Sequence, residues 1–375
     1  MSKNIDVLNR ETRLLLKFLQ DNANQNDVEG IDAEKFFETC QRHRLVNIIC
    51  QRHAQQVAFL PRIIRQRLVE ENRKSSLRQL QNIAAMERVC AEFARLGIRY
   101  QLIKGAVLAR LLYDDVGARM SRDVDFIICQ PHFNQACAVL EKLGYQTKDF
   151  ATAMHHSYVN TDDVIVELHS QLSVFGMKLD GSQSVSVKIA GRDYQVPDAN
   201  EYFVYLCYHG AVHGWYRLLW LVDIVEFSVQ SSKFGVDFIK IAAIAKKYGL
   251  LDVVGQALVL ACELLGAEIP ETFCISKRAE LLAADAWELA IIRDCSMDDC
   301  FSFILQPKRE FLYQLRVQGN IRNRLIYLLT PTVEDRRQFA LPERFAWLYY
   351  CIRPILLLKR MSKKIRNLRK FNLRK

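Results

Sequence analysis

Glycine and proline are scarce in this sequence. Its 15 glycines and 8 prolines make up 23 of 375 residues, which is about half of average usage. Because these two residues interrupt helices and strands, their scarcity indicates long elements and a mostly helical protein. The hydrophobic content of 50% and the charged content of 25% are ordinary globular values, and they exclude wholesale disorder.

Long apolar runs and paired cysteines are also missing. The nearest candidate for a membrane span, 345–358, is interrupted by Arg353 and Pro354, and it is shorter than the roughly 20 residues that a span needs. The 11 cysteines are an odd number without a Cys-x-x-Cys pair, which is typical of free thiols in a reducing compartment. Since no N-terminal signal peptide is present, we expect a cytoplasmic protein, with peripheral attachment to the inner face of the membrane left open.

The net charge of +10 comes from the C-terminal end. From Arg353 onward there are ten cations and no acid, so the first 352 residues sum to zero. Apolar residues recur there at helical spacing, namely Leu358, Met361, Ile365, Leu368 and Phe371. This pattern predicts a basic amphipathic helix. The helix could bind an anionic membrane surface or nucleic acid, or it could simply be solvated.

Along the chain, the patterns predict an α+β protein in which a small mixed sheet is flanked by helical regions. Pro61 and Gly97 bound one long predicted helix. Alternating segments predict strands at 98–103, 123–129, 156–160 and 164–169, and a hairpin at 185–197. The predicted parts are an N-terminal helical region (1–96), an α/β core (97–198), a C-terminal helical region that completes the cleft (199–330) and the basic tail (331–375). Since no linker separates them, we expect the helical regions to pack on the core.

The candidate chemistry lies on the strand that begins at Asp123. Asp123 and Asp125 are two residues apart, so both carboxylates leave the same face of the strand. Like charges this close repel each other unless a divalent cation neutralises them. Glu167 lies on a later strand, and three carboxylates converge if the two strands pair. In-line phosphoryl or nucleotidyl transfer uses two carboxylate-bridged metal ions, so this cluster favours a pair of divalent metal ions.

Cations and a glycine turn accompany the carboxylates. Lys104-Gly105 ends a strand just before a helix, where it can offer an ammonium group and backbone N–H groups to a triphosphate. Arg119 and Arg122 precede Asp-x-Asp and can add phosphate contacts. A solvated strand end would explain Asp-x-Asp alone, but here the motifs occur together and in order.

These motifs resemble a known superfamily. The succession of strand, glycine turn, helix, Asp-x-Asp strand and later strand acid is similar to the nucleotidyltransferase fold of the DNA polymerase β type. More narrowly, the chain resembles a bacterial group of uncharacterised nucleotidyltransferases in which Lys-Gly replaces the commoner Gly-Ser. The matching positions are Lys104-Gly105, Arg119, Asp123, Asp125, Glu167-Leu168-His169, His209, His213 and Trp220-Leu221-Val222-Asp223-Ile224.

The resemblance implies transfer of a nucleoside monophosphate from an NTP to a hydroxyl group, with release of pyrophosphate. Asp123 and Asp125 would hold both Mg²⁺ ions, and Glu167 would complete one metal site and could activate the acceptor. The downstream helices would form one wall of the cleft, with His169, His209, His213 and Asp223 as candidates. A neutral body argues mildly against a long nucleic-acid groove, so a small-molecule or protein acceptor is preferred.

Two alternatives remain open at this point. His209 and His213 have a spacing that can bind zinc, but the glutamate of the metalloprotease motif is missing. We expect Asp223 to orient one of these two histidines or an arginine such as Arg217, rather than to bind metal. The competing function is a catalytically degenerate fold that serves as a nucleotide sensor or a membrane-docked scaffold. His155 and His156 receive no role.

Overall fold

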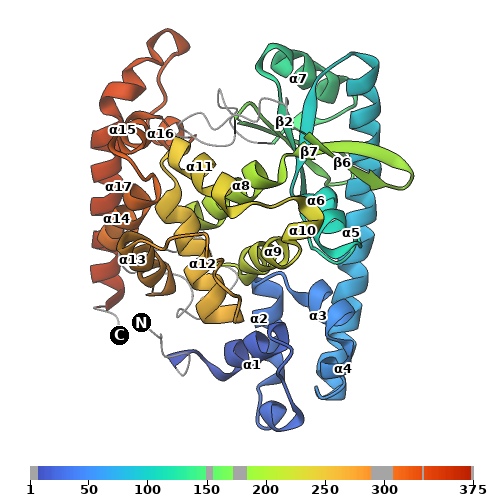
Figure 1. Ribbon diagram of the computed structural model, residues 1–375. Helices are drawn as coiled ribbons and strands as arrows, with labels where there is room; N and C mark the ends of the chain where they lie inside the picture. The colour runs from blue at the N-terminus through green and yellow to red at the C-terminus, as the bar shows by residue number, and fades with distance from the viewer. Residues whose placement is uncertain (1–6, 149–154, 172–183, 289–306, 332, 373–375) are drawn as a thin grey trace.

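The computed structural model describes residues 7–148, 155–171, 184–288, 307–331 and 333–372 (Figure 1). A small mixed sheet is surrounded by helices, as the sequence predicts. Its N-terminal helices are α1 (Arg10–Leu19), α2 (Ala33–Arg42), α3 (Val46–Arg52), α4 (Ala54–Val57) and α5 (Arg62–Arg95). One hydrophobic cluster joins side chains of these helices, the sheet and the C-terminal helices, such as Phe36, Phe126 and Leu260. The helical regions therefore pack on the core.

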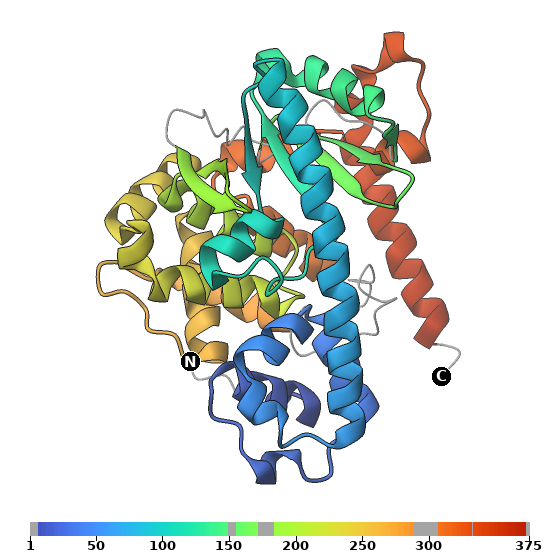
Figure 2. The ribbon, with the colours of Figure 1, turned by 90° about the vertical axis from the view of Figure 1, so that its right-hand side faces the viewer.

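Helix α5 runs along the molecule from the N-terminal helices to the sheet (Figure 2). It begins directly after Pro61, and Gly97 adopts a φ of +67° beyond its end, so the long helix predicted between them is confirmed. Buried amides on α5 hold the backbone that leads into the Asp-x-Asp strand. Gln79 donates to the carbonyl of Arg119, and Asn82 donates to that of Ser121 at 3.3 Å.

The sheet has the strand order β1-β2-β5-β4-β3. Strand β2 is antiparallel to β1 and parallel to β5, which is itself antiparallel to β4. The strands are β1 (Tyr100–Ile103), β2 (Asp123–Ile128), β3 (Gln146–Thr147), β4 (His155–Val159), β5 (Ile165–His169), β6 (Ser184–Ile189) and β7 (Arg192–Pro197). The last two form the predicted hairpin as a separate pair, whereas the short edge strand β3 was not predicted.

Two helices connect strands of this sheet along the chain. Helix α6 (Gly105–Tyr113) lies between β1 and β2, and α7 (Phe133–Lys142) lies between β2 and β3. Helix α6 begins at the Lys104-Gly105 turn, which places its N-terminus beside β2. The aromatic side chains of Phe93 and Phe126 pack edge to face at 5.4 Å between ring centroids. Since β-strand side chains alternate, this contact puts α5 on the face of β2 opposite to Asp123 and Asp125.

The C-terminal helices complete the other side of the molecule. They are α8 (Ala199–Val212), α9 (Leu218–Val229), α10 (Ser231–Phe234), α11 (Phe238–Tyr248), α12 (Leu251–Leu265), α13 (Lys277–Ala286), α14 (Pro307–Val317), α15 (Ile321–Leu329), α16 (Val333–Gln338) and α17 (Leu348–Asn372). Between α8 and α9 the chain turns sharply, and the ring of Trp215 packs on Gly210. A Cβ atom at Gly210 would lie 2.3 Å from that ring, so only glycine fits there.

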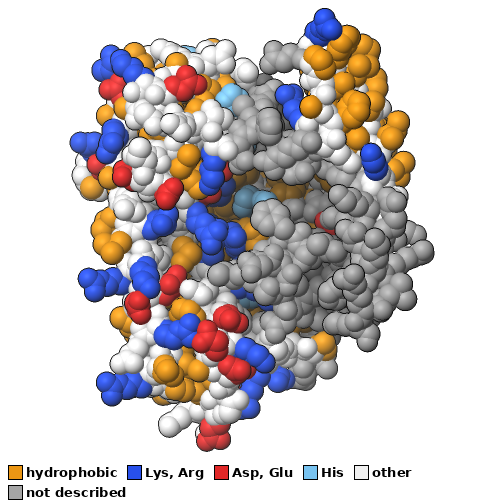
Figure 3. Space-filling model, turned by 180° about the vertical axis from the view of Figure 1, so that it is seen from behind, with side chains coloured by type: hydrophobic (Ala, Val, Ile, Leu, Met, Phe, Trp, Pro, Cys, Tyr) orange, Lys and Arg blue, Asp and Glu red, His pale blue; other side chains and the backbone are white. Residues whose placement is uncertain are grey.

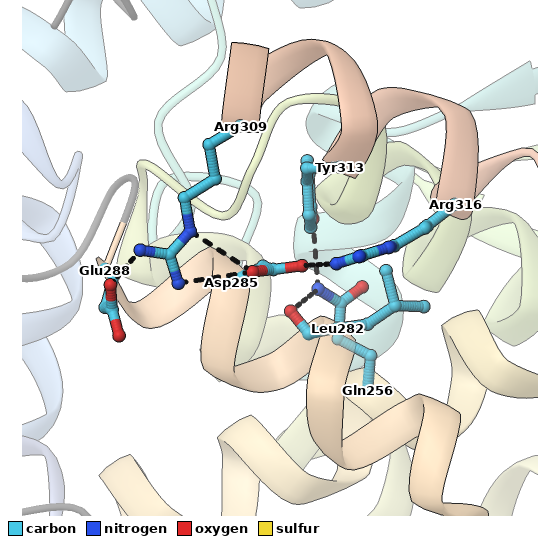
Figure 4. Close-up of polar contacts among 7 residues, drawn as sticks. All are labelled: Gln256, Leu282, Asp285, Glu288, Arg309, Tyr313 and Arg316. Atoms are coloured by element: carbon cyan, nitrogen blue, oxygen red, sulfur yellow. Dashed lines mark hydrogen bonds and ion pairs between the residues drawn. The ribbon is translucent and has the colours of Figure 1, made fainter. Parts of the chain in front are cut away.

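Polar contacts join α12, α13 and α14 to one another (Figure 4), and Tyr313 connects this group to α8. The hydroxyl of Tyr313 on α14 donates to the carbonyl of Ala211 at 2.9 Å, and Gln256 on α12 donates to the Tyr313 oxygen at 3.0 Å. At the end of α13, Asp285 forms ion pairs with Arg309 at 3.2 Å and with Arg316 at 2.5 Å. These contacts stabilise the position of α8, which faces the candidate site.

The predicted C-terminal helix is present as α17. Arg353, grouped with the tail cations in the sequence, is instead buried and forms an ion pair with Asp335 at 2.9 Å. Most side chains from residue 360 onward, with the predicted apolar positions Met361, Ile365, Leu368 and Phe371, lie outside the described residues. Among the described helices, none has the length and hydropathy that crossing a bilayer requires.

Candidate functional site

The predicted carboxylates meet on one face of the sheet. The parallel register of β2 and β5 places Asp125 directly opposite Glu167 and Asp123 opposite Ile165. Asp125 is 1% exposed, whereas Asp123 and Glu167 are half-buried. The convergence predicted from the sequence therefore follows from strand pairing. Asp125 and Glu167 are paired residues of adjacent strands, and Asp123 is two residues away on β2.

The Lys104-Gly105 turn approaches this cluster from β1. Lys104 has a φ of +58° and Gly105 a φ of +50°, and such left-handed backbone is costly for lysine. The Lys104 N–H donates to the hydroxyl of Tyr202 on α8 at 2.5 Å. A Cβ atom at Gly105 would lie 3.6 Å from the carbonyl oxygen of Asp123. Helix α8 thus holds the turn against the start of β2.

The Lys104 ammonium group binds a carboxylate. Its Nζ lies 2.9 Å from Oδ1 of Asp125, whereas the sequence predicts a contact with a triphosphate. Burial by itself would lower the pKa of Lys104, but Asp125 and the acids around it outweigh that effect and raise the pKa. Lys104 is therefore charged, and it offsets part of the repulsion between the carboxylates. From the sequence, only metal ions were expected to offset this repulsion.

Two histidines join the cluster. His169 Nε2 lies 3.1 Å from Asp125 Oδ1 and 3.5 Å from Glu167 Oε2, and His155 Nε2 lies 3.1 Å from Glu167 Oε2. His169 was expected at the cleft wall, but His155 received no role. The hairpin register places His155 directly opposite His169, so counting back from the predicted turn at residues 161–163 would have found it.

These contacts determine the charge of Glu167. Burial would raise its pKa, but hydrogen bonds with His155 and His169 outweigh burial and lower the pKa. For His169, burial opposes protonation, while its hydrogen bonds with Asp125 and Glu167 raise the pKa. Burial and the neighbouring Asp125 raise the pKa of Asp123. Glu167 therefore stays ionised more easily than Asp123.

The cluster has donor atoms suited to a metal ion. Ligand atoms of His155, Glu167 and His169 all lie within 4.8 Å of one another. Oδ2 of Asp125 is buried and, among the described residues, has no hydrogen-bond partner. A buried acceptor without a partner is costly, and a cation would remove that cost. Carboxylates suit both Mg²⁺ and Mn²⁺, and imidazole nitrogens suit transition metals, so Mn²⁺ can use both kinds of ligand.

Arg119 has a different environment from the predicted one. It is 4% exposed, and its Nε and Nη2 atoms lie 2.9–3.1 Å from both carboxylate oxygens of Asp223 on α9. The hydroxyl of Tyr113 also donates to Asp223 at 2.9 Å. The sequence predicts that Asp223 orients an arginine such as Arg217; the arginine is Arg119. This buried ion pair joins the loop before β2 to α9, and it gives Arg119 a structural partner in place of a phosphate.

The remaining predicted residues lie around the carboxylates. Arg122 is exposed at the start of β2. His209 and His213 pack on Trp220, with ring centroids 5.2 and 5.3 Å away. Burial and the nearby Lys104 hold the pKa of His209 well below its usual range, so this imidazole is neutral. Within the described residues these two histidines belong to no metal-binding group, which disfavours the zinc alternative.

A comparison with protein families covers the part of the chain that holds this site. The family described as uncharacterised nucleotidyltransferase matches residues 29–266, more than half of the chain. The chain belongs to this family. The match includes α2 to α5 as well as the sheet and α8 to α12, so it covers the N-terminal helices that hold the Asp-x-Asp loop. No curated protein and no solved structure matches the chain.

Proposed function

We propose that this family member transfers a nucleoside monophosphate from an NTP to a hydroxyl acceptor in a metal-dependent reaction that releases pyrophosphate. One observation carries the proposal: Asp125 lies opposite Glu167 and beside Asp123, with a buried Oδ2 that has no partner among the described residues. An acidic cluster of this kind needs a cation to offset its repulsion. The resemblance to nucleotidyltransferases of the DNA polymerase β type also supports it.

Asp123, Asp125 and Glu167 would hold the metal, with His155 and His169 as nitrogen donors next to them. When bound, Mg²⁺ or Mn²⁺ would offset charge on the phosphates and on the attacking oxygen. Glu167 suits metal binding better than proton abstraction, because its low pKa makes it a weak base. The Gly105 turn lies at the start of α6, and the first N–H groups of a helix can bind phosphate oxygens.

A specific contact favours the second candidate function, a nucleotide sensor without catalytic activity. Lys104 and His169 both occupy Oδ1 of Asp125, so the cluster is partly neutralised by the protein itself. In such a protein the ion pairs would be permanent and metal binding weak. In the enzyme, Lys104 would release Asp125 to the metal and move to a phosphate.

One experiment separates the two functions. The purified chain is incubated with each NTP labelled at the α-phosphate, with Mg²⁺ or Mn²⁺, and with small-molecule hydroxyl compounds, protein or RNA as acceptor. Label transfer that is lost in Asp125→Asn supports the enzyme and identifies the acceptor class. Tight NTP binding without transfer to any acceptor or release of pyrophosphate supports the sensor.

A further inference from the structure

A basic pocket of about 630 Å³ lies next to the carboxylate cluster. It is formed where α2 ends, along the middle of α5 and at the loop that enters β2. Its charged and hydroxyl-bearing lining residues are Arg44, Lys74, Arg78, Arg122, Glu71, Ser75 and Ser121. Seen from behind, Lys and Arg side chains gather beside a histidine at the middle of the face (Figure 3). The N-terminal helices thus contribute to the surroundings of the site.

Three of the four cations that line this pocket have no ion-pair partner among the described residues. Lys74 pairs with Glu70 on the same helix at 2.6 Å. Arg44, Arg78 and Arg122 form no ion pair with any carboxylate in the part of the chain that the structure describes. Glu71 supplies one negative charge to the lining against four positive charges. An unbalanced concave surface of this kind attracts anions.

Arg44 combines an unfavourable backbone conformation with other guanidinium groups nearby. Its backbone has a φ of +56°, a conformation that is costly for a residue with a side chain. Burial, together with the neighbouring Arg217 and Arg122, lowers the pKa of Arg44 to about 9, although the nearby Asp123 carboxylate acts in the opposite direction. Three guanidinium groups therefore crowd one another beside the site, and a bound anion would offset their repulsion.

The pocket is continuous with the catalytic face. The Ser121 hydroxyl is within hydrogen-bond distance of the Asp123 carbonyl oxygen (3.0 Å) and Oδ1 (3.1 Å). Ile165, on the opposite side of the lining, pairs with Asp123 in the sheet register. A ligand that fills the pocket therefore lies next to the first carboxylate of the Asp-x-Asp motif.

We infer that this pocket binds a phosphate group of a substrate through Arg44, Arg78 and Arg122. One guanidinium group can bind two phosphate oxygens at once. The three side chains come from different segments of the chain, so they can surround a phosphate group. The phosphate belongs either to the end of the NTP or to a phosphorylated acceptor. The inference rests on the proposed function for the identity of the substrate, but not for the binding itself.

The test measures binding of inorganic pyrophosphate to the full chain by calorimetry in metal-free buffer, at low and high salt. We expect Arg78→Gln and Arg122→Gln each to weaken binding at least about tenfold, the effect of losing one charged hydrogen-bond pair. Arg73→Gln is the matched control, since Arg73 is also exposed on α5 but lines a different pocket, and it should bind as the unchanged chain does. Absence of binding, or equal binding by all variants, overturns the inference.

Competition identifies which substrate carries the phosphate. If NTP displaces pyrophosphate and Arg78→Gln weakens NTP binding equally, the pocket holds the phosphates of the NTP. If NTP and pyrophosphate bind together, the pocket holds a phosphorylated acceptor. Because no turnover is needed, a protein without transferase activity would still give a clear result. Failure of the proposed function is thus distinguishable from failure of this inference.

Discussion

Asp125 and Glu167 face each other across two adjacent parallel strands, and Lys104 binds Asp125 from a third strand end. A carboxylate pair and its internal cation are therefore held together by backbone hydrogen bonds of the sheet. This relationship makes Asp125 both a candidate metal ligand and the counter-charge of a buried lysine. The two roles have different consequences for mutation.

Asp125→Asn should abolish nucleotidyl transfer, since it removes charge from the metal site but little volume. Carboxylate repulsion alone would make this variant more stable without metal. The structure predicts the reverse, because Lys104 loses its buried counter-charge. We expect the free energy of unfolding to fall by about 3 kcal/mol, measured by denaturant titration in chelator. Activity within tenfold of the unchanged chain would contradict the metal assignment.

Lys104→Met should make stability depend more strongly on metal. Without the ammonium group, Asp125 keeps a buried negative charge with only His169 beside it. We expect the variant to melt at lower temperature in chelator and to regain more of that loss on adding Mn²⁺ than the unchanged chain gains. The nucleotide KM is measured in parallel. An increase in KM with little change in melting temperature would instead support the predicted triphosphate contact.

His155→Ala should change the preference among metals. Its imidazole lies at the Glu167 carboxylate, and imidazole favours transition metals over Mg²⁺. We expect Mn²⁺ affinity to fall by about tenfold, the lower end of effects seen when a metal-site partner is removed, with a smaller loss for Mg²⁺. Calorimetry with both ions measures this. His156→Ala is the neighbouring control, and unchanged Mn²⁺ affinity in His155→Ala would place His155 outside the metal site.

Arg119→Met should act on stability rather than on nucleotide binding. The variant leaves Asp223 buried with a charge that only Tyr113 contacts, which costs about 3–5 kcal/mol for a broken buried ion pair. The double variant with Asp223→Leu should recover part of this loss, because neither charge remains. Unfolding curves give the coupling energy. A variant that is stable but has a strongly raised KM for NTP would restore the phosphate role.

Removal of residues 359–375 should abolish binding to anionic liposomes. It takes away nine of the ten C-terminal cations, and cations near an anionic bilayer contribute up to about 1 kcal/mol each. Exposed apolar side chains lie on and before α17, at Trp347 (61%), Tyr350 (55%), Ile355 (65%) and Leu358 (63%). Sedimentation of the full chain should weaken at high salt. Binding to RNA but not to liposomes would assign the tail to nucleic acid, and binding to neither would leave it as a solvated helix.

Much of the local structure could be predicted because it depends on nearby residues. Pro61 and Gly97 bound α5, Asp123 begins a strand, and the Thr161-Asp162-Asp163 turn joins β4 to β5. Each of these positions has a backbone preference that acts within a few residues. The shared face of Asp123 and Asp125 follows from strand geometry in the same way.

Partner choice could not be predicted, because it depends on distances between residues far apart in the chain. The sequence determined which charged groups lie on which strand or helix, and hence the carboxylate cluster. Only the tertiary structure decided that Lys104 pairs with Asp125, that Asp223 pairs with Arg119 rather than Arg217, and that Arg353 is buried. The reason is that a buried charge must find an opposite charge, and the packing of α8, α9 and α17 determines which one lies within reach.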